Sequence, residues 1–237
     1  MRVLVLADIH ANLEALNGVL ADAGEFDVIW SLGDIVGYGP NPNEAIARLN
    51  EYRHVAIAGN HDWAVLGKID VAEFNVDARR SNLWTREQLI PSSRAYLQEL
   101  PESRIEGQFI LVHGSPRRPI WEYLLDADQA RHSFSHYGTP ICLVGHTHVP
   151  VVFRNDARDG HCAALQVPER VTIHLEDSRC IINPGGVGQP RDGDPRASYL
   201  LLDTESMTFE YRRIDYDVAE TQRKMREVGL PKRNRIR

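Results

Sequence analysis

Residues 1–10 read MRVLVLADIH, an apolar run from Val3 to Ala7 that ends in Asp8 and His10. A nearly continuous apolar run is typical of a strand covered on both faces. The pattern recurs in DVIW (27–30), HVAIA (54–58), FILVH (109–113) and ICLVG (141–145). Apolar residues at helical spacing, for example over 13–20, 43–50 and 76–99, separate these runs. The alternation predicts an α/β fold.

The second part of the chain follows another pattern. After residue 150 come short β-branched and aromatic runs separated by turn residues, and a helical segment begins near Asp217. We therefore predict one domain over residues 1–237, a four-layer αββα sandwich of two mixed β-sheets flanked by helices. We expect the functional loops in 8–148, and the second sheet and a C-terminal helix in 150–230.

The composition excludes several classes of protein. The 237 residues include 43% hydrophobic residues and carry a net charge of −6, so a uniformly basic nucleic-acid surface is not expected. No apolar stretch approaches the ~18 residues of a membrane span, and the N-terminus lacks the pattern of a signal peptide. The three cysteines show no CxxC spacing, which is typical of a reducing compartment. We expect a cytoplasmic protein.

Polar residues follow each of the five strong strands. They are Asp8 and His10, then Asp34, then Asn60 with His61 and Asp62, then His113, then His146 and His148. In open α/β sheets, ligands bind beyond the carboxyl ends of the strands, so five neighbouring strands would bring these side chains into one site. Imidazole, carboxylate and amide ligands without a thiolate suit Mn, Fe, Zn or Ni. A shared carboxylate can bridge two such ions ~3.5–4 Å apart, as in enzymes that act on phosphorus.

This ordered series resembles the calcineurin-like metallophosphoesterase superfamily. The resemblance implies a dinuclear metal centre at the strand ends, and it implies a role for each residue. Asp8, His10 and His148 would hold one ion, Asn60, His113 and His146 the other, and Asp34 would bridge them. His61 would lie beside the ions and assist the leaving group. We expect Mn²⁺, with Fe, Zn and Ni as alternatives.

The chemistry that the resemblance implies is hydrolysis of a phosphate ester. A water that bridges two cations loses a proton near neutral pH and becomes the nucleophilic hydroxide. Charge then builds on the leaving oxygen, where a protonated imidazole is useful. Asp62 could tune His61, although an N-cap or surface carboxylate is an equal reading.

The segment after Asp34 separates branches of the superfamily. Protein Ser/Thr phosphatases carry there an Asp that orients the catalytic His and an Arg that grips the phosphate, whereas this chain has Gly37 and Tyr38. A protein phosphatase is therefore disfavoured, and the chain resembles the small bacterial and archaeal phosphodiesterase-like branch. The Gly-rich turn before Arg191 also resembles that branch. We name Arg191 and Tyr38 as candidate substrate contacts, with Arg191 ahead of Arg196.

The predicted function is thus a phosphodiesterase with a small phosphorylated or nucleotide substrate. A phosphomonoesterase or protein phosphatase, a dinucleoside polyphosphate hydrolase and a nuclease share this chemistry, and the acidic balance disfavours the nuclease. A non-catalytic scaffold on the same fold remains an alternative, but a scaffold relative of this kind has lost the residue that matches His61. Trp121 and Tyr123 could stack on a base or line a dimer contact, and core packing is the favoured reading. Edge strands could pair in a homo-oligomer. The basic segment 232–237 is read as a solvated tail.

Overall fold

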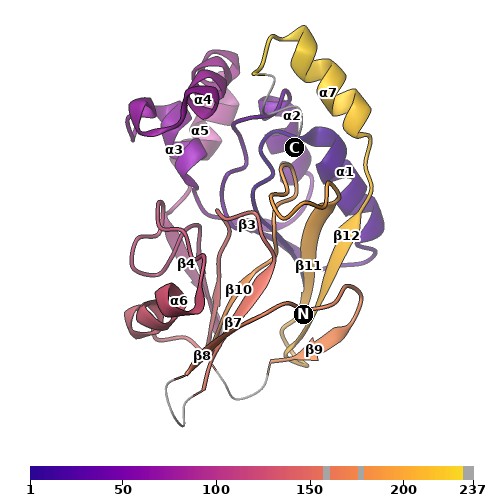
Figure 1. Ribbon diagram of the computed structural model, residues 1–237. Helices are drawn as coiled ribbons and strands as arrows, with labels where there is room; N and C mark the ends of the chain where they lie inside the picture. The colour runs from indigo at the N-terminus through magenta and orange to yellow at the C-terminus, as the bar shows by residue number, and fades with distance from the viewer. Residues whose placement is uncertain (157–160, 176–178, 232–237) are drawn as a thin grey trace.

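The computed structural model describes residues 1–156, 161–175 and 179–231. Within them, two six-stranded β-sheets pack face to face, with helices on the outer faces (Figure 1). The predicted four-layer α/β arrangement is confirmed. The basic segment 232–237 lies outside the described residues. None of the described helices combines the length and hydrophobicity that a membrane crossing requires.

The first sheet has the strand order β3-β2-β1-β11-β12-β9. Strands β1, β2 and β3 run parallel, and β11, β12 and β9 add antiparallel pairs. Their bounds are β1 Arg2–Leu6, β2 Val28–Ser31, β3 His54–Ala56, β9 Thr172–His174, β11 Ala197–Asp203 and β12 Thr208–Ile214. The sheet is therefore mixed, with its parallel half at the N-terminal end of the chain.

The second sheet has the order β4-β5-β6-β10-β7-β8, in which β5, β6 and β10 run parallel. Its strands are β4 Ser103–Glu106, β5 Phe109–Val112, β6 Ile141–Leu143, β7 Val151–Asn155, β8 Cys162–Leu165 and β10 Arg179–Asn183. This corrects our expectation that the second sheet lies within 150–230, because half of its strands come from 103–143. A strand buried on both faces has the same apolar pattern in either sheet, so the pattern did not assign β5 and β6.

The helices lie largely where their sequence patterns predicted. The α-helices are α1 Leu13–Asp22, α2 Pro42–Asn50, α3 Asn60–Leu66, α4 Val76–Gln88, α5 Pro91–Gln98, α6 Ala127–Ser133 and α7 Val218–Glu227, with the 3-10 turns η1 Val71–Glu73 and η2 Phe134–His136. The helical region 76–99 is broken at Pro91, as its sequence predicts, and Pro91 starts α5. Helices α3 and α6 and the short strand β4 were not predicted, because each is short and lacks a strong apolar period.

The core lies in three layers, and alternation along β1 shows how they are separated. Leu4 and Leu6 pack toward α1 and α2, whereas Val3 and Val5 pack between the two sheets. The third layer lies between the second sheet and α6, and it includes the buried free cysteines Cys142 and Cys162. Because both faces of the central strands are covered, the loops at their carboxyl ends are held by rigid elements on every side.

Candidate metal centre

The predicted site residues all lie at the carboxyl ends of the parallel strands. Asp8 and His10 follow β1, Asp34 follows β2, Asn60 and His61 begin α3 after β3, His113 follows β5, and His146 and His148 follow β6. All eight side chains are at most 3% exposed. Our expectation of five adjacent strands is wrong, since β1, β2 and β3 belong to one sheet and β5 and β6 to the other. The loops nevertheless converge, because the two sheets pack face to face.

The backbone of these loops is strained. Among the described residues, nine residues other than glycine have positive φ, and five of them are Asp8, His10, Asp34, His146 and His148. A left-handed conformation costs a non-glycine residue on the order of 1–3 kcal/mol, and such residues gather at functional sites. Close approach adds a second constraint, because a Cβ at Gly59 would lie 2.1 Å from Asp34 Oδ1. The packing of the surrounding residues therefore offsets this strain and holds these side chains toward the site.

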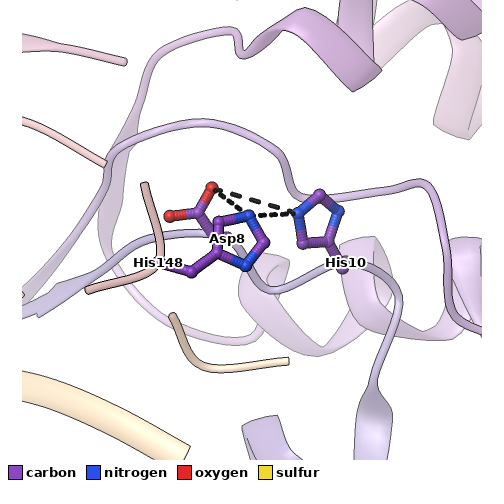
Figure 2. A group of neighbouring side chains, drawn as sticks. All are labelled: Asp8, His10 and His148. Carbon is purple, nitrogen blue, oxygen red and sulfur yellow. Dashed lines mark hydrogen bonds and ion pairs between the residues drawn. The ribbon is translucent and has the colours of Figure 1, made fainter. Parts of the chain in front are cut away.

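Asp8, His10 and His148 form a first group (Figure 2). The two Nε2 atoms of the histidines lie 3.1 Å apart. Asp8 Oδ1 lies 3.4 Å from His148 Nε2 and 3.9 Å from His10 Nε2. Both carboxylate oxygens of Asp8 also accept from the backbone N–H of His146. The facing atoms therefore surround one point, as three ligands of one ion would.

Asp34, His113 and His146 form a second group, which Asn60 joins. His113 Nε2 lies 3.0 Å from Asn60 Oδ1, 3.1 Å from His146 Nδ1 and 3.3 Å from Asp34 Oδ2. Asp34 Oδ2 is also 3.6 Å from His10 Nε2 in the first group. One carboxylate oxygen therefore lies between the two groups, where a bridging ligand would be needed.

A backbone carbonyl holds the outer nitrogen of each imidazole in the two groups. His10 Nδ1 donates to Val36 O, His113 Nδ1 to Leu32 O, His146 Nε2 to Trp121 O and His148 Nδ1 to Gln189 O. A carbonyl only accepts, so each outer nitrogen carries the hydrogen and each inner nitrogen presents a lone pair. Lone pairs that meet at 3.1 Å repel unless a cation lies between them. The donor set therefore fits divalent metal ions.

The pKa values of three of the four imidazoles agree with this arrangement, whereas that of His113 departs from it and requires an ion that displaces its proton. Burial lowers the pKa of His10, His146 and His148 well below the ordinary value and raises that of Asp8 to about 7. Burial also acts to lower the pKa of His113, but the Asp34 carboxylate outweighs it and the pKa is raised to about 9. Neutral imidazoles are the form that binds a metal, and the carboxylates need a nearby positive charge.

His61 lies against the second group but is held differently. Its backbone N–H donates to Asp34 Oδ1 at 2.8 Å, and its ring Nδ1 donates to the side-chain oxygen of Asn82 at 2.8 Å. The ring is 4.8 Å from the His10 ring, and His61 also forms a metal-capable group with His10 and Asp34. Burial lowers its pKa.

Asp62 is neither a surface carboxylate nor a partner of the His61 ring. It is fully buried and accepts from the backbone N–H groups of Gly59 and Val36 at 2.9 and 3.1 Å. Burial and the nearby Asp34 raise its pKa to about 7. Asp62 therefore fixes the turn at the start of α3, as the residue at position N3 of a capping box does.

The structure brings the two candidate substrate contacts together beside His10 and His61. The guanidinium of Arg191 lies 5.8 Å from the ring centre of Tyr38, and this ring is 4.7 Å from that of His10 and 4.4 Å from that of His61. In the described residues Arg191 forms no ion pair, and its nearest acceptor is Gln189 Oε1 at 3.1 Å. Arg196 is instead engaged by Asp194 and Glu169. Arg191 is therefore the cation that remains open to an anion.

Three further aromatic side chains lie beside His61 and His146. Tyr123, which is 42% exposed, stacks on His146 with ring centres 3.8 Å apart. Trp121 packs against Phe74 at 5.1 Å, and Phe74 contacts the edge of the His61 ring at 5.0 Å. Core packing, which we favoured for Trp121 and Tyr123, is wrong for Tyr123 and incomplete for Trp121. We refer to Phe74, Trp121 and Tyr123 as the aromatic rim.

Sequence patterns missed Asn82 and Phe74. Asn82 lies 21 residues from His61 in the chain, within a helix that matches no motif. One signal was present, because the buried face of α4 consists of Ala78, Ser81, Asn82 and Thr85, three of which are polar. A buried helix face that is polar needs polar partners, and here the partner is His61.

Known proteins resemble this chain over nearly its whole length. A family model described as the calcineurin-like phosphoesterase superfamily domain matches residues 1–207. An uncharacterized protein of Methanocaldococcus jannaschii is 39% identical over 236 residues, which are 97% of this chain and 93% of that protein.

Two crystal structures extend the comparison. A metallophosphoesterase from Sphaerobacter thermophilus is 45% identical, with a TM-score of 0.90 over 99% of this chain and 97% of that one. A hypothetical protein from Pyrococcus horikoshii is 20% identical, with a TM-score of 0.78 over 99% and 96%, and this likeness concerns the fold alone.

Proposed function

This chain belongs to the calcineurin-like phosphoesterase superfamily and is a metal-dependent phosphoester hydrolase, and we propose that it is a dinuclear phosphodiesterase for a small phosphorylated or nucleotide substrate. The observation that carries the proposal is the set of four imidazoles, each held by a backbone carbonyl, whose lone pairs meet around two carboxylates. Such a set is suited to hold cations and to present an anionic ester to them.

The proposed ligand assignment follows the two groups. Asp8, His10 and His148 would hold one ion, Asn60, His113 and His146 would hold the other, and Asp34 would serve both. When bound, the ions supply positive charge to the phosphate oxygens and lower the pKa of water in the site. The protein contributes the fixed positions of the ligands, because the carbonyl bonds leave each ring only one orientation. We propose Mn²⁺ as the ion.

The remaining residues have roles at the ester itself. His61 is the proposed acid, since it adjoins both groups and its Nδ1 hydrogen is held by Asn82. In its imidazolium form, which the lowered pKa makes a stronger acid, Nε2 gives a proton to the leaving oxygen. Arg191, with Tyr38 beneath its guanidinium, is the proposed contact for a phosphate oxygen.

Two features support a diester with a planar substituent. In the part of the chain that the structure describes, Arg191 lies beside the site without an ion pair, and one guanidinium matches the single negative charge of a diester. A monoester carries close to two negative charges at neutral pH. Tyr123 of the aromatic rim is exposed beside His146 and can stack on a nucleobase. A nucleotide-type diester would use both features.

Hydrolysis of model esters tests the proposal. Protein stripped with a chelator is assayed on bis-p-nitrophenyl phosphate and p-nitrophenyl phosphate, without metal and with Mn²⁺, Zn²⁺, Ni²⁺ or Fe²⁺. The expected result is cleavage that requires metal, is fastest with Mn²⁺ and favours the diester. Faster cleavage of the monoester would reject the phosphodiesterase assignment. Absence of cleavage with every ion, in protein shown to contain metal, would reject the proposed function.

A further inference from the structure

Asn82 makes a buried contact with His61 that the proposed function does not yet use. Its side-chain oxygen accepts from His61 Nδ1 at 2.8 Å, and the two side chains are 0% and 3% exposed. We propose that Asn82 is the positioning residue for His61, and that it fixes the ring so that Nε2 is the atom that transfers the proton. The inference rests on the proposed role of His61 as the acid.

His61 differs from the four other site histidines in what holds it. His10, His113, His146 and His148 are fixed by backbone carbonyls, so no single substitution removes their partners. His61 is fixed by the side-chain oxygen of Asn82. The Nδ2 atom of Asn82 makes no hydrogen bond among the described residues. The Asn82 side chain therefore uses its oxygen to hold the imidazole of His61, while its Nδ2 group is buried without a partner among the described residues, which is unfavourable.

The segment that follows Asp34 has no room for this partner. Gly37 lies against the His61 ring, and a Cβ built on it would be 2.5 Å from His61 Nδ1. Its φ of +89° is also a conformation that other residues rarely adopt. A side chain that contacts Nδ1 must therefore come from another element, and α4 supplies it.

The packing of α4 on α3 fixes the distance between the two residues. His61 lies in the first turn of α3, and the carbonyl of Ala64 in the same helix accepts from Arg86 Nη2 at 2.6 Å. Arg86 is one turn after Asn82 on α4. At the other end, Asn75 caps α4 by accepting from the N–H groups of Asp77 and Ala78. These contacts, before and after Asn82 along α4, fix Asn82 beside the imidazole of His61.

The consequence concerns the proton. An amide oxygen accepts but cannot donate, so Nδ1 keeps its hydrogen throughout the reaction. The proton on Nε2 passes to the leaving oxygen as its bond to phosphorus breaks, and the imidazole becomes neutral. Without Asn82 the ring can turn, and the hydrogen can occupy either nitrogen. Leaving groups that need a proton should then depart more slowly, whereas p-nitrophenolate, a stable anion, should not.

The test compares Asn82→Leu, which keeps the size but loses the acceptor, with Asn82→Asp, which keeps the acceptor. Thr85→Val is the matched control, because Thr85 is fully buried on the same face of α4 and its hydroxyl has no hydrogen-bond partner among the described residues. Each protein is loaded with metal, and kcat is measured on methyl p-nitrophenyl phosphate and on a dialkyl phosphate ester. The hydrogen position on His61 is read from long-range ¹H–¹⁵N NMR spectra of histidine-labelled, zinc-loaded protein.

We expect Asn82→Leu to lower kcat on the dialkyl ester by about 10- to 100-fold, to change kcat on the p-nitrophenyl ester less than about threefold, and to lose the Nδ1–H tautomer. Asn82→Asp should retain both kcat on the dialkyl ester and the Nδ1–H tautomer of His61, and Thr85→Val should match the unmodified protein. An equal loss on both esters, a fall in metal content, or an Nε2–H tautomer in the unmodified protein would overturn the inference. Failure of the unmodified protein to hydrolyse any ester would instead reject the proposed function.

Discussion

At the scale of single residues, Asp34 carries more constraints than any other side chain in the site. Its φ is +53°, one oxygen accepts from the backbone of His61 at 2.8 Å, and the other lies within 3.6 Å of both His113 and His10. Burial would raise its pKa, but His113 and His61 outweigh burial and hold the pKa well below the ordinary value. It is therefore a carboxylate at every physiological pH, as a bridging ligand must be.

The first prediction concerns this charge. Asp34→Asn keeps the shape of the side chain and removes the negative oxygen between the two groups, so both ions should bind weakly and activity should fall at least about 100-fold. Metal content by mass spectrometry after gel filtration, measured together with kcat, checks this. Asp22→Asn is the control, because it makes the same change at a carboxylate that pairs with Arg170 and belongs to neither group. Two ions retained in Asp34→Asn would contradict the bridge.

The second prediction separates His61 from the ligands. His61→Ala should keep both ions and lower kcat on a dialkyl phosphate ester, whose leaving group needs a proton, by ~10²–10⁴-fold, the usual scale for a lost general acid. The reason is that the two proposed ligand sets are complete without it. Loss of an ion from His61→Ala would instead show that its membership in the third metal-capable group with His10 and Asp34 is real binding.

The residues that the sequence predicted and those it missed differ in a physical way. The candidate ligands were found because metal chemistry selects residue types, and strand ends place them at fixed spacings in the chain. Their carbonyl partners, such as Leu32 O and Trp121 O, could not be found, since every residue has a carbonyl and only the fold selects one. Asn82 was missed for a related reason, because its contact with His61 exists only once α4 packs on α3 and cannot be read from an Asn in a helical pattern.

At the scale of elements, the loop from Gln189 to Arg196 shows how Arg191 is kept near the site. Asp192 pairs with Arg213 of β12, and Arg196 pairs with Asp194 and with Glu169. These charged contacts lie on the surface, but together they hold both sides of the loop. Arg191 itself forms none of them, so the loop is fixed while its proposed functional cation stays open.

The third prediction uses the pH dependence of this network. Hydrogen bonds from Arg196 lower the pKa of Asp194 from 3.8 to about 2, so the folded protein favours the carboxylate. Its contribution to stability is therefore present above pH 4 and is lost as the pH falls toward 2. Because the pair is partly exposed, Asp194→Asn should cost only ~0.5–1 kcal/mol at pH 7. Urea unfolding at several pH values should show that the free energies of unfolding of Asp194→Asn and of the unmodified protein become more similar below pH 4. A difference that stays constant with pH would contradict the assignment.

The strands show which part of the fold could be predicted at this scale. Their existence followed from apolar runs, because burial on both faces demands such runs. Their partners did not follow, since β10 pairs with β6, which ends at Leu143, and with β7, which ends at Asn155, although β10 itself begins only at Arg179. The main-chain bonds that join these strands carry no side-chain code. The exposed strand β4 was missed because its residues pack against little.

At the scale of the whole molecule, the two proposed ions join the two sheets. Asp8, His10 and Asn60 follow strands of the first sheet, whereas His113, His146 and His148 follow strands of the second. Each proposed ligand set therefore combines both sheets. The division of the five strong strands between two sheets, which the sequence pattern did not reveal, is what makes the site a link between them.

The fourth prediction follows from this link. Without a cation, His148 Nε2 of the second sheet faces His10 Nε2 at 3.1 Å and Asp8 Oδ1 at 3.4 Å, both from the first sheet, and this weakens the contact between the sheets. An ion that binds only the folded protein adds ~2.7 kcal/mol when its free concentration is 100 times its dissociation constant. In a chain of this size that corresponds to a rise of about 5–10 °C in Tm. Calorimetry of chelator-treated protein, with Mn²⁺ added in steps, should show Tm increase with concentration.

Asp34→Asn is the control for the same experiment, because it should bind the ions weakly and so gain little. A Tm that stays constant while two ions bind would mean that the sheets are held by their apolar layers alone. In that case the strain at Asp8, His10, Asp34, His146 and His148 would have to be offset by packing in the unloaded protein. A rise in Tm that Asp34→Asn abolishes would instead show that the ions needed for hydrolysis also close the junction between the two halves of the fold.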